Sequence, residues 1–155
     1  DYDIMKLAEA LSLRADLQKR LAQLKGRMKE SAKVQEGDTP PEDIAVLEKE
    51  FDSLLGQLET LIYRINVTNL ATADDEGATL TALIARRDVL AMRVSSMREV
   101  LDFVSEPDNR YGRNEIKTVR LVDVAEARRK LDGHSRSLRE LDMKIQGLNW
   151  TVELK

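Results

Sequence analysis

Two adjacent arginines offer the strongest chemical signal in the 155-residue chain. Arg87 falls in a line of apolar residues in a predicted helix, so its guanidinium should meet a neighbouring helix. A buried guanidinium costs several kcal/mol unless it is paired and hydrogen-bonded. Antiparallel pairing with the preceding helix would bring Arg87 level with Asn66 and Asn69. The first helix would pass the same level between Glu9 and Asp16, so we expect one of these carboxylates to pair with Arg87.

Three interpretations of this polar cluster are open. It could fix the register of the helices, bind a ligand or a partner protein, or form a subunit interface. Its members are Glu9, Asp16, Asn66, Asn69, Arg86 and Arg87.

The single histidine, His134, also lies in an apolar line of a predicted helix. One imidazole supplies one metal-coordinating nitrogen, and the chain has no cysteine. Asp132, Ser135 and Ser137 are close in sequence, but residues at these offsets on a helix do not converge as a catalytic triad. We therefore expect no catalytic residue, no metal and no cofactor, and we predict that the protein is not an enzyme.

Basic residues are frequent between residues 110 and 139, where nine Lys and Arg stand against four Asp and Glu. Nucleic-acid binding needs clustered positive charge. The whole chain has a net charge of −3, and mixed charges on a helix usually face solvent. Nucleic acid is therefore not the expected partner, although weak binding is one alternative.

The helices that must position these residues follow from composition and periodicity. The chain has few glycines (seven), prolines (three) and aromatic residues (4%), and 34% of its residues are charged. This composition is typical of long helices. Apolar residues recur at spacings of three and four, which we call a seam, in four stretches. These stretches are 5–33, 40–72, 79–104 and 123–148. The predicted fold is all-α: an antiparallel bundle of four long helices with coiled-coil-like seams and minor short strands.

Local signals set the expected boundaries of these elements. Thr39 and Glu42 form a capping-box pattern with Pro40 at the first helical position, so a helix should begin there. Two stretches resemble short strands, at 116–122 and 150–154. Residues 5–35 carry a net charge of +5 (8 basic, 3 acidic), and residues 36–62 carry −7 (1 basic, 8 acidic). These opposite charges favour pairing of the first two helices.

Residues 5–155 are expected to form a single domain, and residues 1–4 resemble the remnant of an expression tag. No segment has the roughly 18 to 20 uncharged apolar residues that span a bilayer. Residues 5–20 carry charges where a signal peptide would be apolar. We expect a cytoplasmic protein and no membrane partner.

Several short segments are similar to a family of uncharacterised bacterial proteins described as septicolysin-like. They include Lys6–Leu11, Lys33–Gly37, Arg110 with Tyr111, and Asn149–Thr151. The resemblance implies family membership along the chain from Met5, and the family name implies a membrane-active, cytolysin-type protein. A membrane-active helix should combine an aromatic apolar face with a basic polar face. The first helix has only the basic face.

The function expected from the sequence is that of a non-enzymatic oligomeric scaffold or protein-interaction protein. Membrane activity of the septicolysin type and weak nucleic-acid binding are the alternatives. A two-fold homo-oligomer would let the strand before the fourth helix of one chain pair with the strand after the fourth helix of another. An unidentified protein partner is also expected. The residues predicted to form the oligomer contact are Ile116, Val119, Trp150, Val152 and Leu154.

Overall fold

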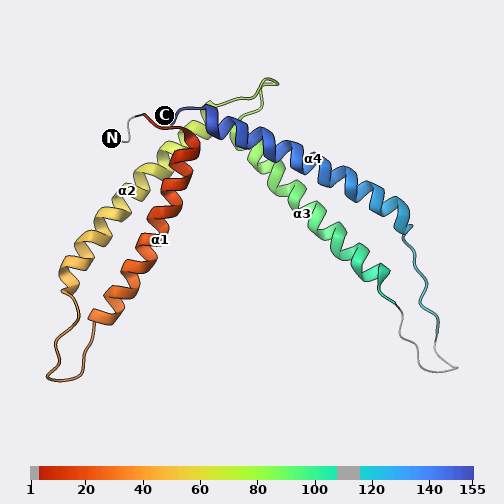
Figure 1. Cartoon of the computed structure of the whole chain (residues 1–155). Helices are drawn as coiled ribbons and strands as arrows, with labels where there is room; N and C mark the ends of the chain where they lie inside the picture. The colour runs from red at the N-terminus through yellow and green to blue at the C-terminus, as the bar shows by residue number, and fades with distance from the viewer. Residues whose placement is uncertain (1–3, 108–115) are drawn as a thin grey trace. The chain divides into compact units, whose positions relative to one another are not determined.

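The computed structural model describes residues 4–107 and 116–155 and confirms the all-α prediction (Figure 1). Four long helices lie within these described residues: α1 (Leu7–Ser31), α2 (Ile44–Ala71), α3 (Leu80–Ser105) and α4 (Val124–Thr151). Within the described residues, β-structure is limited to two isolated bridges, Lys6 with Glu153 and Ala73 with Thr79.

The chain divides into two compact units. Unit 1 comprises Asp1–Thr81 and Gln146–Lys155, and unit 2 comprises Ala82–Ile145. The boundaries fall inside α3 and α4, so unit 2 is inserted into the sequence of unit 1. A single domain over residues 5–155 stays a prediction, as does the tag remnant, of which residues 1–3 lie outside the described part.

Unit 1 is built on the antiparallel pair of α1 and α2, which lie side by side (Figure 1). Buried residues recur at seven-residue intervals on both helices. They are Ala10, Leu17 and Leu24 on α1, and Leu47, Leu54 and Leu61 on α2. Seven-residue spacing keeps one face of a helix turned to its neighbour. The seams predicted for these helices therefore form the core of unit 1.

The start of α2 differs from the prediction. The helix begins at Ile44, and Asp43 is its N-cap, because the Asp43 carboxylate accepts a hydrogen bond from the Ala45 N–H (2.9 Å). The capping box at Thr39 is wrong. Pro41 disfavours the helical conformation at the residue before it, Pro40, so the helix cannot begin there. Glu42 instead binds Arg27 of α1, with Arg27 Nε donating to Glu42 Oε2 (2.9 Å).

The strand predicted at 116–122 is wrong, and the one predicted at 150–154 is reduced to a bridge at Glu153. Residues 116–122 form neither a helix nor a strand in the described structure. The helix α4 continues to Thr151, whose hydroxyl donates to the Gly147 carbonyl (3.0 Å). The alternation of apolar residues from Trp150 onward therefore includes the last turn of a helix, and only Glu153 takes part in a bridge.

Unit 2 consists of most of α3 and α4 with the segment that joins them. The two helices lie side by side (Figure 1), and an ion pair between Arg87 and Asp142 joins them. In unit 2 the buried residues of α3 are Leu83, Val94 and Leu101, which belong to the predicted seam. On α4, Asp123 caps the first turn by accepting a hydrogen bond from the Glu126 N–H (3.2 Å).

Candidate functional site

Arg87 lies at the edge of the α3 seam and bridges α3 and α4. Its guanidinium contacts Asp88 (3.4 Å) and Asp142 (3.5 Å), and its side chain is 30% exposed. The expectation of a fully buried Arg87 is wrong. A long arginine at the edge of a helix interface can cover apolar surface with its methylenes while its charge stays hydrated.

The predicted polar cluster is distributed over both units. Glu9, Asp16 and Asn66 are exposed in unit 1, where Asn69 is half-buried, and Arg86 is exposed in unit 2. The ion pairs of Arg87 among the described residues are those with Asp88 and Asp142, so the expectation of Glu9 or Asp16 as its partner is corrected to Asp142. We do not propose a ligand or interface role for this cluster.

The polar centre that the structure does assemble lies in unit 1, around Thr68. This side chain is fully buried, and its hydroxyl donates to the Arg64 carbonyl (2.7 Å). The same oxygen accepts a hydrogen bond from the Lys155 N–H (2.9 Å), and Arg64 Nε donates to the Lys155 carbonyl (2.9 Å). Thr68 thus anchors the C-terminal segment to α2.

Backbone hydrogen bonds complete this anchor. The Leu7 N–H donates to the Val152 carbonyl (2.8 Å), and the Leu154 N–H donates to the Met5 carbonyl (2.9 Å). Leu154 is buried and Val152 half-buried within their own chain. We therefore do not propose strand exchange through these two residues, because their backbone groups are paired in unit 1.

Sequence reasoning assigned Asn66 and Asn69, the neighbours of Thr68, to the Arg87 cluster and gave Thr68 no role. The signal that could have found the anchor is the position of Thr68, seven residues after Leu61. A threonine at a position whose predecessors are buried leucines must have a buried hydrogen-bond partner.

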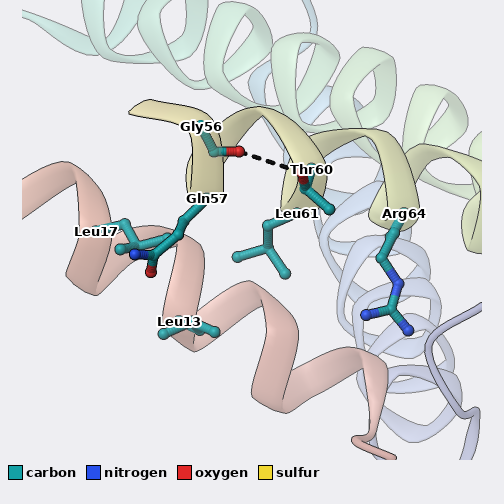
Figure 2. Close-up of a pocket in the computed structure, with 7 residues that line it drawn as sticks. All are labelled: Leu13, Leu17, Gly56, Gln57, Thr60, Leu61 and Arg64. Atoms are coloured by element: carbon teal, nitrogen blue, oxygen red, sulfur yellow. Dashed lines mark hydrogen bonds between the residues drawn. The ribbon is translucent and has the colours of Figure 1, made fainter. Parts of the chain in front are cut away.

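A shallow groove lies between α1 and α2 in unit 1 (Figure 2). Leu13, Leu17 and Leu61 supply apolar surface, and the groove also contains Gly56, Gln57, Thr60 and Arg64. Its volume of about 290 Å³ lies at the lower end of small-molecule pockets, which span about 300–1,000 Å³. Its one charged group, Arg64, is already bonded to Lys155. The groove therefore offers no further charged group that could orient a ligand.

No metal site is found in the described residues: nowhere in 4–107 and 116–155 do three His, Asp or Glu side chains gather in a group that could hold an ion. His134 is half-buried on α4. Of the basic stretch considered for nucleic acid, residues 110–115 lie outside the described part.

The two most exposed large apolar side chains of the described residues lie in unit 2. Ile116 and Leu121 are more than 90% exposed, and Val119 and Phe103 are more than 70% exposed. Phe103, Val119 and Leu121 line a common groove between the end of α3 and the segment before α4. Apolar surface concentrated in this way marks an interaction site more often than single exposed residues do. In unit 1, Trp150 is also exposed, at 62%.

The fold and these surfaces define an all-α protein of two helical units with an apolar face on one of them. The chain belongs to a family of unknown function, DUF6847, whose model matches residues 14–154. The septicolysin-like resemblance is wrong, because the matches of the chain are to this family and to a structure of unknown function. Short shared segments of helical sequence do not carry enough information to assign a family.

A solved structure shows the same fold. It is the crystal structure of a functionally unknown conserved protein from Corynebacterium diphtheriae, which is 38% identical in sequence. The match covers 99% of this chain and 100% of that chain with a TM-score of 0.91. No curated protein matches. Among the described helices, none combines the length and apolar character needed to cross a membrane.

Proposed function

We propose that the protein is a non-enzymatic helical scaffold that acts by binding protein surfaces and assembles as a two-fold homo-oligomer. The observation that carries the proposal is the exposed apolar face of unit 2. Burying apolar surface yields roughly 25 cal/mol per Å², so side chains such as Phe103, Val119 and Leu121 favour association with another protein.

The incomplete burial of the α4 seam supports the same proposal. Leu131, Leu138 and Leu141 lie in the seam but are only half-buried. Seam residues of a self-sufficient helix pair are normally covered by the partner helix. A second protein surface would complete their burial. The cytoplasmic location stays a prediction.

Mass in solution tests the oligomer. Light scattering from the purified chain over a range of concentrations should give a mass of about twice 17.6 kDa at the higher concentrations. A mass of one chain at every concentration would contradict the homo-oligomer. Reproducible turnover of a substrate, lost on mutation of a single side chain, would contradict the non-enzymatic role.

A further inference from the structure

The helix α3 has a second apolar line besides its seam. We call it the outer stripe, and its residues follow one another at spacings of three and four: Ala85, Val89, Met92, Ser96, Val100 and Phe103. All six are exposed, with values of 64% for Val89, 69% for Met92, 53% for Val100 and 76% for Phe103. The stripe contains no charged residue. Its mean spacing is about 3.6 residues, the repeat of a straight α-helix, so its residues share one face of α3.

Through Ala85, Val89 and Met92 the outer stripe does not face α4, whereas its other three residues also line hollows that α3 shares with the start of α4 or the segment before it. With roughly 100° of rotation per residue, its centre lies about 150° around the helix from the buried Leu83, Val94 and Leu101. Those three residues form the seam within unit 2. A stripe on nearly the opposite side is therefore available to a second surface.

The charges beside the stripe indicate what that surface is. Arg86 and Arg93 flank it on one side, and Asp88 and Glu99 flank it on the other. When two identical helices pack in parallel about a two-fold axis, each flank meets the opposite flank of the partner. In an antiparallel pair each flank meets itself. The stripe of α3 is therefore complementary in charge to a parallel copy of itself and repulsive toward an antiparallel copy.

The register of the charges fits the parallel arrangement. Asp88 and Arg93 are five residues apart on opposite flanks, the offset at which charged side chains pair between parallel helices. The Asp88 side chain is 66% exposed, although it also contacts Arg87. In the described residues Arg93 forms no ion pair of its own. The two-fold axis would create the Asp88–Arg93 pair twice.

We infer that the outer stripe of α3 is the homodimer interface, formed by two copies of this chain with their α3 helices parallel and in register. This inference rests on the proposed homo-oligomer and specifies which surface forms it. Val89, Met92 and Phe103 supply the apolar contact, and Ser96 meets its own copy. The Asp88–Arg93 pairs select the parallel orientation.

Single cysteines test the register directly, because the natural chain contains none. Ala85→Cys and Ser96→Cys should each form a disulfide-linked dimer under mild oxidation, since a disulfide requires Cα atoms within about 7 Å. These two positions are 11 residues apart, about 16 Å along the helix, so an antiparallel pair could link at most one of them. Ser95→Cys, on the acidic flank, and Ser53→Cys, on α2, are the matched controls and should link far less.

A charge placed in the stripe tests its energetic role. Met92→Lys should raise the dimer dissociation constant by about 30-fold or more, the effect typical of a central interface residue. Met143→Lys is the matched control, because Met143 is an equally exposed methionine, at 73%, on α4. Asp88→Lys and Arg93→Glu should each weaken the dimer about 3- to 10-fold, and the double variant should recover most of the loss.

The outcomes separate this inference from the proposed function. If the wild type is a dimer but Ala85→Cys and Ser96→Cys do not both form disulfides, the α3 interface is overturned and the homo-oligomer stands. The same holds if Met143→Lys weakens the dimer as much as Met92→Lys. A wild-type monomer at all concentrations overturns both. Disulfide linkage at both positions, together with weakening of the dimer by Met92→Lys but not by Met143→Lys, supports the interface.

Discussion

The α1–α2 pair of unit 1 and the α3–α4 pair of unit 2 are both antiparallel helix pairs, but they bury their apolar residues unequally. In unit 1, leucines at seven-residue intervals on both helices are almost completely buried. On the part of α4 that belongs to unit 2, all of which the structure describes, Ile145 alone is buried. The difference teaches that the same seam pattern gives a self-sufficient core in one place and an incomplete one in the other.

The largest expected effect comes from truncating a core leucine of unit 1. Leu54 is 4% exposed, so Leu54→Ala should lower the free energy of unfolding by about 2–5 kcal/mol through lost burial and a residual cavity. Leu131→Ala, in the half-buried seam of α4, should cost about half as much or less in dilute protein. Urea unfolding monitored by circular dichroism measures both. Equal losses would show that the two pairs are equally well packed.

Removing the buried hydroxyl of the unit 1 anchor should have the next largest effect. Thr68→Val keeps the shape of the side chain but leaves the Lys155 N–H without its acceptor, which should cost about 1–3 kcal/mol. Thr60→Val is the matched control, because the Thr60 hydroxyl also bonds to a carbonyl one turn earlier, that of Gly56, but is exposed. Its effect should remain within about 0.5 kcal/mol. If Thr68→Val lowers the free energy of unfolding no more than this, the buried hydroxyl of Thr68 does not stabilise unit 1.

The ion pair of unit 2 should contribute less than the anchor of unit 1. Arg87→Ala should lower the free energy of unfolding by about 1 kcal/mol, because the charges of Arg87 and Asp142 remain partly hydrated. Asp142→Asn should give a similar loss, and the double variant should lose less than the sum if the two side chains interact. A loss of 3 kcal/mol or more for Arg87→Ala would show instead that unit 2 closes fully over the guanidinium.

The smallest expected effect is the pH dependence of the Arg27–Glu42 pair in unit 1. Hydrogen bonding from Arg27 lowers the pKa of Glu42 below its ordinary value of 4.5. Stability from this pair is therefore present above pH 4.5 and is lost as the pH falls through the lower pKa of the folded protein. Thermal unfolding of Glu42→Gln should differ from that of the wild type at pH 7, and the difference should shrink on acidification. A difference that grows below pH 4 would contradict the pairing.

The elements of both units could be predicted from the sequence because helical periodicity is a local property. The spacing of Leu47, Leu54 and Leu61 is sufficient to define a buried face. The end of α4 was mispredicted because the short run from Trp150 to Leu154 fits a strand and the last turn of a helix equally well. The backbone hydrogen bond from the Val152 N–H to the Leu148 carbonyl (3.0 Å) distinguishes them.

The partners of the polar residues could not be predicted, because they depend on which helices meet. Arg87 was correctly placed in a seam, but whether α2 or α4 covers that seam is a tertiary choice. The buried Thr68 depends on a segment 87 residues away in the sequence. The outer stripe of α3, by contrast, can be read from its periodicity once the structure shows that a different face is buried.

The pairing of Met5–Leu7 with Val152–Leu154 has a consequence for how the protein folds. The α1–α2 pair joins residues close in sequence, whereas this pairing brings together residues about 145 positions apart. Contacts between distant residues carry a larger loop-closure entropy and form late in folding. The ends of the chain should therefore dock after the α1–α2 pair has formed. In amide hydrogen exchange, the Leu7 and Leu154 amides should gain protection after those in the middle of α1 and α2.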